Sequence, residues 1–498
     1  MHIKSLATIA FFGGLWLFSV PRAVGITKDC HIGSYRLDDG RTVDIAPSDG
    51  DTLRWRMFTG ETGQLHSQKD ATWASTYGWT DRPDGKTVSF SSCAESGITF
   101  ESEPGRRIVF DVRETTFESN GVKLVGRLVL PKRSGKIPVV VLVHGSDSLS
   151  ALDAFALQRM FPAQGIGAFV YDKRGTGGSG GTSTQDFDVL AADAVAAMKE
   201  AKRLAGSRLG RIGYQGGSQG GWVVPLAVNR APVDFAIVSY GLAVTILEED
   251  QESVALDMYF HHHSAEDTKK ALALARAGEG VFETRGKEGY AAFDALRQKY
   301  KSEPWYKDVH GDFLFFIMPL NEEQIIDAMT KELSFSKTAH FHYEPMPTLR
   351  ASTTPQLWVL GSDDLEAPSA ETAKRIKSLI AQGKDYALAV YPGAEHGMTE
   401  YELNANGGRV STRFAPGYFQ MMADFARDGQ TAGIMGKLKS PSLCASTPPT
   451  LLESRFNARH SAESEITSRT HLAVGTRDDD HVTTRGRSAI AICVADLV

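Results

Sequence analysis

The chain has 498 residues, of which 42% are hydrophobic and 23% are charged, and its formal net charge is −6. This composition is that of an ordinary globular protein with two or three domains. The sequence contains no basic run interleaved with aromatic residues, which argues against nucleic acid or another polyanion as a partner.

The N-terminus, residues 1–25, has the pattern of a secretory signal peptide. His2 and Lys4 precede the apolar run LATIAFFGGLWLFSV, and the small-x-small sequence AVG follows at 23–25. This run of 15 residues is short for a transmembrane helix, which needs about 20. We therefore expect cleavage after Gly25, no stable membrane span in the mature protein, and a periplasmic or extracellular location.

The four cysteines are possible disulfide partners, because an exported protein matures in an oxidising compartment, where disulfides form. Cys30 and Cys93 lie in one N-terminal segment and are the natural pair. Cys444 and Cys493 lie near the C-terminus, and the sequence leaves open whether they pair or stay free. No ligand spacing indicates a metal, and the triplet 261–263 of histidines is interpreted as polar surface. We expect neither a metal nor another cofactor.

Residues 26–112 are predicted to form a small antiparallel β-domain. Short alternating segments are separated by Asp39-Gly40 and Asp84-Gly85, which are typical turns of β-hairpins.

The pattern changes at residue 113 to strands that alternate with helices, which indicates a mostly parallel sheet flanked by helices. The apolar, β-branched run 137–145 is expected to be a strand covered on both faces. Residues 243–345 contain several helical stretches and no convincing strand, so we expect a helical cap inserted into an α/β domain that spans 113–437.

The last segment, residues 438–498, contains neither Trp nor Tyr and only one Phe. A segment of this kind buries too little apolar surface to offset the entropy that it loses on ordering. We expect a disordered tail.

The segment GYQGGSQGGW, residues 213–222, holds one serine, Ser218, among five glycines. It follows a predicted buried strand, precedes a predicted helix and fits the motif G-x-S-x-G. In this motif the serine stands on a strained turn, and glycines avoid collisions with the flanking strand and helix. The backbone N–H of Gln219, at the start of the helix, can point at a developing oxyanion.

A serine hydroxyl is a weak nucleophile that needs a base, which is itself oriented by an acid. In this arrangement the chain order is Ser, then Asp or Glu, then His, each at a strand end. Asp363 and Asp364 follow a predicted buried strand in LWVLGSDDLEAP, and His396 follows the next strand in YPGAEHGM. The order predicts a catalytic triad and leaves both aspartates open as its acid.

With these motifs the chain resembles the α/β-hydrolase superfamily over roughly residues 115–430. The matching segments are VLVHGSD, VYDKRGTGGSGG, GYQGGSQGG, WVLGSDDLEAP and YPGAEHGM. The resemblance implies an α/β-hydrolase fold, with the helical cap as an insertion. The family pattern G-x-x-D-x-x-x-P fits Gly361, Asp364 and Pro368, which favours Asp364 over Asp363 as the acid.

The resemblance also implies roles for residues around the triad. The second N–H of the oxyanion hole, beside that of Gln219, would come from Ser146. His144 is expected to support the site without acting as the base. Asp172 and Arg174 are expected to hold loops together.

The substrate is not fixed by the resemblance, because this superfamily includes esterases, lipases, peptidases, thioesterases and members without catalysis. We predict a secreted serine carboxylesterase that acts on small-molecule esters. Two alternatives stay open. One is a serine peptidase of the proline-iminopeptidase or prolyl-oligopeptidase kind, and the other is a non-catalytic binding protein on the same fold.

A peptidase that recognises a protonated α-amine needs carboxylates at the site. The candidates are Glu248, Glu249, Asp250 and Glu252, where the predicted cap begins. Their other interpretation is that acidic residues are favoured in the first turn of a helix by the helix dipole.

Overall fold

The computed structural model describes residues 30–330 and 338–429. The predicted signal peptide 1–25 and the predicted tail 438–498, with Cys444 and Cys493, lie outside the described residues. No helix in the part of the chain that the structure describes is long and apolar enough to span a membrane.

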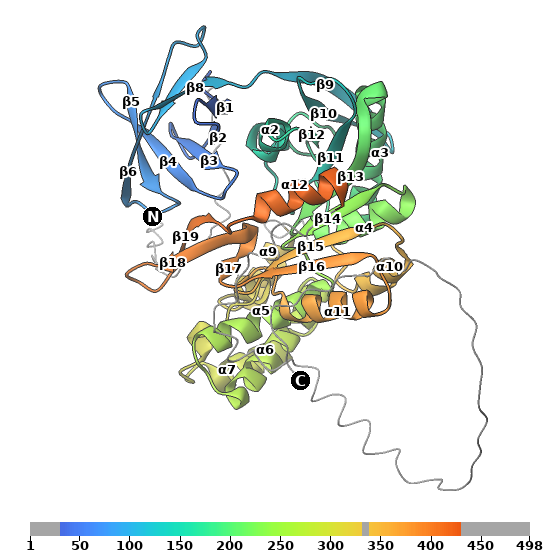
Figure 1. Cartoon of the computed structure of the whole chain (residues 1–498). Helices are drawn as coiled ribbons and strands as arrows, with labels where there is room; N and C mark the ends of the chain where they lie inside the picture. Colours follow the sequence, from blue (N-terminus) through green and yellow to red (C-terminus); the bar gives the residue numbers. More distant parts are fainter. Residues whose placement is uncertain (1–29, 331–337, 430–498) are drawn as a thin grey trace, which may run out of the picture.

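Eight short antiparallel strands at the N-terminal side close into a barrel (Figure 1). The strands are β1 (Gly33–Leu37), β2 (Thr42–Pro47), β3 (Leu53–Met57), β4 (Thr62–Ser67), β5 (Thr72–Tyr77), β6 (Pro83–Phe90), β7 (Gly97–Phe100) and β8 (Glu103–Arg107). Strand β1 pairs with both β2 and β8, which closes the barrel. Alternate side chains such as Tyr35, Val43, Trp55 and Phe100 fill the interior. The prediction of a small antiparallel β-domain is confirmed, although the sequence did not indicate its closure.

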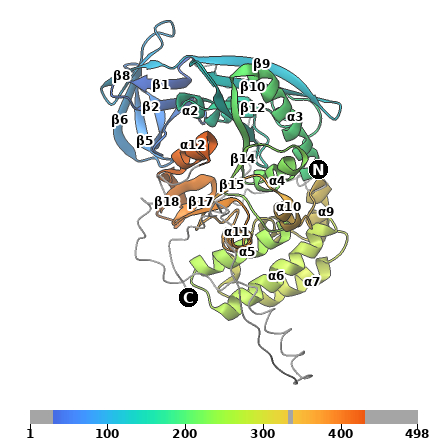
Figure 2. The same ribbon diagram turned by 45° about the vertical axis from the view of Figure 1, so that its right-hand side comes forward.

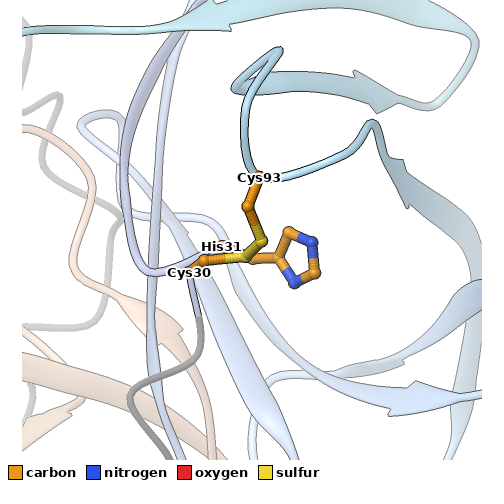
Figure 3. A group of neighbouring side chains, drawn as sticks. All are labelled: Cys30, His31 and Cys93. Carbon is orange, nitrogen blue, oxygen red and sulfur yellow. A yellow bond between two sulfur atoms is a disulfide. The ribbon is translucent and has the colours of Figure 1, made fainter.

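A disulfide between Cys30 and Cys93 joins the beginning of the described chain to the connection between β6 and β7 (Figure 3). The predicted pairing of these two cysteines is confirmed.

The second domain is built on a sheet of eight strands in the order β16-β15-β14-β13-β11-β12-β10-β9. Their bounds are β9 (Phe110–Ser119), β10 (Val122–Pro131), β11 (Ile137–Val143), β12 (Gly167–Tyr171), β13 (Leu209–Gly217), β14 (Phe235–Ser239), β15 (Gln356–Gly361) and β16 (Tyr386–Tyr391). Strands β9 and β10 are antiparallel to their neighbours, whereas the other six are parallel to one another. The parallel strands therefore end at the same edge, where their loops can share a site.

Helices cover both faces of this sheet. They are α1 (Ala151–Ala154), α2 (Leu157–Ala163), α3 (Phe187–Ala205), α4 (Gly220–Arg230), α10 (Pro345–Ala351), α11 (Ala370–Ala381) and α12 (Tyr418–Asp428). Along β11, Val139 and Val141 belong to one apolar cluster with side chains of α3, α4 and α11, whereas Val140 and Leu142 belong to another with α2 and α12. Because alternate residues of a strand point to opposite faces, the two clusters are the two layers of an α/β core. The predicted α/β-hydrolase fold is confirmed.

The helical cap is inserted between β14 and β15. Its helices are α5 (Ile246–Phe260), α6 (Ala265–Glu283), α7 (Tyr290–Tyr300), α8 (Leu314–Ile317) and α9 (Glu322–Thr330). Figures 1 and 2 show the cap and the barrel at opposite ends of the molecule, with the sheet between them.

A small third sheet follows β16 and was not predicted. It consists of β17 (Ala394–Glu395), β18 (Thr399–Leu403) and β19 (Arg409–Phe414), and the short 3₁₀ turn His396–Met398 connects β17 to β18. Strands β18 and β19 pair as an antiparallel hairpin. In both views this hairpin lies on the side of the main sheet that faces the barrel (Figures 1 and 2).

Candidate active site

Ser218 lies at the turn between β13 and α4 and has a φ of +53°, in the left-handed region that non-glycine residues rarely adopt. The glycines beside it are required by contacts. A Cβ atom added at Gly216 would lie 2.7 Å from a methyl group of Val224 in α4, and one added at Gly217 would lie 2.4 Å from the hydroxyl of Tyr240. The turn therefore places the Ser218 side chain on a tight bend at the carboxyl edge of the sheet.

Asp364 follows β15 and His396 follows β17, and the structure brings their side chains together. Nδ1 of His396 lies 3.0 and 3.1 Å from the two carboxylate oxygens of Asp364. Asp364 is completely buried, and its Oδ1 also accepts hydrogen bonds from the backbone N–H groups of Glu366 and Ala367. This arrangement leaves Nε2 of His396 as the nitrogen available to a substrate or a nucleophile.

The neighbouring residue, Asp363, makes other contacts. Its carboxylate accepts hydrogen bonds from the hydroxyls of Ser362 and Tyr401. The structure thus pairs His396 with Asp364 and not with its neighbour.

Tyr240, directly after β14, connects the serine turn to the histidine. Its ring packs edge-on against that of His396 with the ring centroids 4.9 Å apart, while its hydroxyl lies against Gly217. Burial raises the pKa of Tyr240 to about 12, so the hydroxyl stays protonated at neutral pH. Sequence reasoning missed this residue; its position at the end of a buried strand was the one available signal.

The loop after β11 lies on another side of Ser218. A Cβ atom added at Gly145 would lie 3.6 Å from Cβ of Ser218. Nζ of the buried Lys173 donates a hydrogen bond of 2.8 Å to the carbonyl of Gly145. Because the carbonyl and the next N–H of a trans peptide point in opposite directions, this bond turns the N–H of Ser146 away from Lys173. Burial lowers the pKa of Lys173 to about 8.

The other predicted site residues lie as follows. Gln219 is buried directly before the first turn of α4, where helical N–H groups have no partner within the helix. His144 is buried, with Nε2 3.2 Å from the carbonyl oxygen of Tyr171 and Nδ1 3.8 Å from Asp147. Its two ring nitrogens thus face groups other than the triad.

Asp172 and Arg174 hold loops together, as expected. The carboxylate of Asp172 accepts hydrogen bonds from the Ser150 hydroxyl and from the N–H of Gly178. Arg174 makes a two-point contact with the carboxylate of Asp193 in α3.

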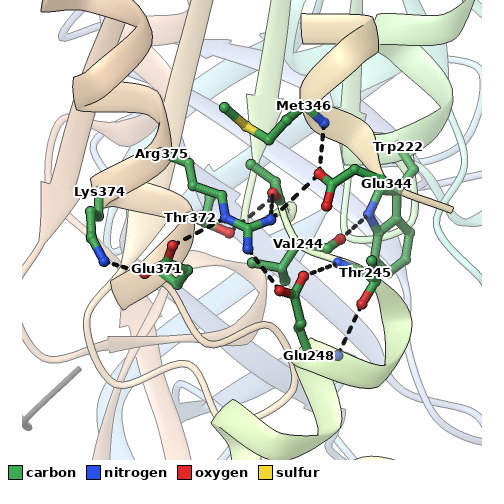
Figure 4. Close-up of polar contacts among 11 residues, drawn as sticks. Trp222, Val244, Thr245, Glu248, Glu344, Met346, Glu371, Thr372, Lys374 and Arg375 are labelled. Atoms are coloured by element: carbon green, nitrogen blue, oxygen red, sulfur yellow. Dashed lines mark hydrogen bonds and ion pairs between the residues drawn. The ribbon is translucent and has the colours of Figure 1, made fainter. Parts of the chain in front are cut away.

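Two of the four acidic residues at the start of the cap, Glu248 and Asp250, make structural contacts, whereas the buried Oε2 of Glu252 has no hydrogen-bond partner among the described residues. Glu248 forms a capping box with Thr245 at the start of α5 and pairs with Arg375 at 2.8 Å (Figure 4). Asp250 accepts hydrogen bonds from the N–H groups of Phe313 and Leu314. Burial and the charge of Glu371 raise the pKa of Glu252 to about 8.

The remaining acidic residue, Glu249, is buried in the first turn of α5. It is 7% exposed, and its carboxylate makes no hydrogen bond or ion pair with any residue in the described ranges. Burial, together with the charges of Asp312 and Asp250, holds the pKa of Glu249 well above its usual range, and the charges of Asp364 and Glu366 add to this shift. The carboxyl group of Glu249 therefore interacts electrostatically with Asp364 and Glu366.

Carboxylates also surround His396. Oε2 of Glu366 lies 3.5 Å from Nε2 of His396. Burial and the charges of Asp250 and Glu366 raise the pKa of Asp312 to about 7, and His396 opposes this shift.

The charge balance at His396 favours the imidazolium form. Burial lowers the pKa of His396, but the charges of Asp364, Glu366 and Asp312 outweigh it and raise the pKa to about 10. A protonated histidine cannot accept a proton from a serine hydroxyl. A cation bound among these carboxylates would oppose the shift and return His396 toward the neutral form.

Comparison with known families gives a match to a peptidase family. A family model described as X-Pro dipeptidyl-peptidase (S15 family) matches residues 120–394, more than half of the chain. The matched range includes Ser218 and Asp364 and ends two residues before His396. No curated protein matches the chain.

Several solved structures are similar to the chain. The acylaminoacyl peptidase of Pyrococcus horikoshii is 15% identical with a TM-score of 0.36, over 71% of this chain and 52% of that one, so the chain spans about half of its length. An esterase of Pyrococcus furiosus is 15% identical with a TM-score of 0.34, over 58% of this chain and 85% of that one. The protein Est1E of Butyrivibrio proteoclasticus, solved with ferulic acid, is 17% identical with a TM-score of 0.33, over 57% of this chain and 90% of that one.

Proposed function

Because the chain belongs to the X-Pro dipeptidyl-peptidase (S15) family, and is thus a serine hydrolase of the α/β-hydrolase fold, we propose that Ser218, His396 and Asp364 are its catalytic triad. Oγ of Ser218 attacks the substrate carbonyl while Nε2 of His396 takes the hydroxyl proton. Asp364 holds His396 in the tautomer with the proton on Nδ1 and stabilises the imidazolium that forms.

The remaining steps follow from this assignment. The N–H groups of Gln219 and Ser146 donate to the oxyanion of the tetrahedral intermediate. His396 then gives its proton to the leaving group, which departs and leaves an acyl group on Ser218. A water molecule, deprotonated by His396, attacks this acyl-enzyme and releases the acid and the free serine.

For the substrate, we propose acyl compounds that carry a protonated amine near the scissile bond, such as peptides with a free N-terminus. The buried side chain of Glu249, whose charge interacts with that of Asp364, is the observation that supports this class. Charging this buried side chain without a partner is costly, which is why its pKa is raised, and an ammonium group beside it would stabilise the carboxylate form. The same ammonium would reduce the excess negative charge around His396 and so favour its action as a base.

The test compares an alanyl or prolyl p-nitroanilide that has a free α-amine with its N-acetylated counterpart. We expect kcat/KM to be at least about 10-fold higher for the free amine, which corresponds to about 1.4 kcal/mol of transition-state stabilisation. Glu249→Gln should remove this preference. Glu248→Gln is the matched control, because Glu248 is the preceding residue in α5 but binds Arg375, and it should keep the preference.

The carboxylesterase predicted from the sequence is the second candidate. It is favoured by the structural contacts of Glu248 and Asp250, which leave few carboxylates for an amine. Cleavage of an ester also needs no cation site, since an alkoxide is a better leaving group than an unprotonated amine. A kcat/KM for p-nitrophenyl butyrate that exceeds the value for every free-amine anilide by about 100-fold, without any effect of Glu249→Gln on either, would favour this candidate.

We also propose that the protein is exported. The disulfide between Cys30 and Cys93 supports an oxidising compartment. N-terminal sequencing of the secreted protein would test this, with Ile26 expected as the first residue.

A further inference from the structure

We propose that the N-terminal barrel is a positioning element for His396, because two of its turns dock on the hairpin β18–β19 and this hairpin holds the turn that carries the histidine. This inference rests on the proposed function, in which His396 is the base that activates Ser218. It gives a role in catalysis to a domain that contains none of the predicted triad residues.

Backbone hydrogen bonds attach the barrel to β19. The N–H of Trp79, in the β5–β6 turn, donates to the carbonyl of Ser411 at 2.9 Å, and the N–H of Phe414 donates to the carbonyl of Gly60, in the β3–β4 turn, also at 2.9 Å. Strand β19 is thus bonded to the barrel as well as to β18. Bonds of this kind fix the position of one backbone relative to the other.

Two glycines allow this close approach. A Cβ atom added at Gly78 would lie 2.3 Å from the backbone oxygen of Thr412 and 2.5 Å from its Cα, and one added at Gly60 would lie 2.4 Å from the backbone oxygen of Phe414. Gly85 lies in the same barrel and also has a positive φ, but a Cβ atom there would meet nothing within 4 Å. The glycine at 78 is therefore required by the docking and not only by its turn.

Side chains strengthen the docked surface. The ring of Trp79 packs edge-on against Phe414 with centroids 5.6 Å apart. The buried guanidinium of Arg54 lies 4.2 Å from the Trp79 ring and donates a hydrogen bond of 2.8 Å to the carbonyl of Gly78. Arg54, on β3, thus holds the docking turn in place.

Ser411 links the contact with the barrel to the turn that carries His396. Its carbonyl is the group that Trp79 binds, while its hydroxyl donates to the carboxylate of Glu395 and lies 3.1 Å from the hydroxyl of Thr399. Glu395 is the residue before the turn His396–Met398, and Thr399 is the residue after it. The barrel, β19 and both ends of the histidine turn are therefore connected through one residue.

The connection matters because Ser218 and Asp364 lie at ends of strands in the main sheet, whereas His396 lies on the small sheet that the barrel contacts. Proton transfer from Ser218 requires heavy atoms about 2.6–3.2 Å apart. A misplacement of about 1 Å can reduce the rate by about 100-fold. In this proposal, docking of the barrel determines the distances from His396 to Ser218 and to Asp364.

The test compares Gly78→Ala with Gly85→Ala in the full chain. Both add a methyl group at a positive φ, +59° and +76°, but only the methyl at 78 meets the hairpin. The readout is the rate at which a fluorophosphonate labels Ser218, because this rate depends on activation of the serine and not on the class of substrate. We expect the rate to fall at least about 10-fold in Gly78→Ala and to stay within about 2-fold of the wild-type value in Gly85→Ala.

The pH profile separates this role from a loss of stability. If His396 moves away from Asp364, the pH at which labelling reaches half of its maximum should shift down in Gly78→Ala, while circular dichroism shows both variants folded. Should Gly78→Ala fail to fold, Ser411→Ala tests the positioning role instead. This variant keeps the backbone hydrogen bond from Trp79 and loses the hydroxyl contacts with Glu395 and Thr399. It should slow labelling and shift the profile in the same direction.

Equal labelling rates and equal pH profiles in Gly78→Ala and Gly85→Ala would overturn the positioning role while leaving the proposed function intact. Equal behaviour of Ser411→Ala and the wild type would do the same if that variant is the one that folds. Absence of label on Ser218 in the wild-type protein would refute the proposed function, and the inference with it.

Discussion

Two neighbouring aspartates provide a matched test of the triad at the residue scale. Asp364 contacts Nδ1 of His396 at 3.0 Å, while Asp363 accepts a hydrogen bond from Tyr401. Asp364→Asn should lower kcat by about 10⁴-fold, because an amide stabilises the wrong tautomer of the histidine. Asp363→Asn should cost far less. Steady-state kinetics of both variants check this, and equal losses would contradict the assignment.

The charges around His396 give a pH dependence with a defined sign. Since His396 acts as a base only when neutral, and its pKa is raised to about 10, kcat/KM should fall as the pH falls through this alkaline range. A free histidine would place the fall near pH 6.5. Glu366→Gln removes a negative charge 3.5 Å from Nε2, so it should lower the pKa and move the fall to lower pH.

The pH–rate profile of kcat/KM with p-nitrophenyl butyrate measures this effect. Glu266→Gln, in the first turn of α6, changes the net charge by the same amount and should leave the profile in place. A wild-type profile with its midpoint near 6.5 would mean that His396 does not interact with these carboxylates as described.

Residue types and chain order predicted a Ser, Asp and His set, because the nucleophile motif and the two strand ends are local patterns, and the resemblance to the α/β-hydrolase superfamily favoured Asp364 over Asp363. They did not predict Tyr240, Glu366 or Asp312. The contacts of these side chains involve segments far apart in the sequence, and such contacts cannot be predicted from a local sequence pattern. The acidic segment at the start of the cap was noticed, but only packing distinguishes Glu249 from Glu248, which binds Arg375.

At the scale of elements, the disulfide should stabilise the barrel. Cys30 and Cys93 are separated by 63 residues, and a cross-link that closes a loop typically contributes about 2–4 kcal/mol. A small domain buries limited apolar area and depends on such a link. The double variant Cys30→Ser, Cys93→Ser should lower the free energy of unfolding by that amount, measured with denaturant. Wild-type protein unfolded under reducing conditions should lose as much, whereas no loss in either would contradict the prediction.

Strands β11, β12, β14 and β15 of the main sheet were predictable as continuous apolar runs, since they are buried on both faces. The hairpin β18–β19 was not. Residues of β18 and β19 are mostly half-buried, because the hairpin lies between the barrel and the main sheet, and half-buried strands lack a clear apolar alternation. Closure of the barrel could likewise not be predicted from the sequence, since it depends on the pairing of β1 with β8 across the whole domain.

At the scale of the whole molecule, the described residues already complete the layers of the hydrolase. One face of the sheet is covered by α3, α4 and α11, and the other by α2 and α12, whose side chains Met421, Met422 and Phe425 are buried against the strands. Both faces of the sheet thus carry an apolar cluster built from the described residues.

A chain that ends at residue 437 should therefore keep its activity. It retains α12, both apolar clusters, and all the residues of the proposed triad and oxyanion hole. We expect kcat/KM and the midpoint of thermal unfolding to stay within about 2-fold and about 2 °C of the full-length values, since substitutions away from packed features rarely change stability by more than about 0.5 kcal/mol. A chain that ends at residue 417, before α12, is the control and should fail to fold, because it exposes one face of the sheet. Loss of activity in the protein that ends at 437 would show that the segment 438–498 contributes to the site or to its stability.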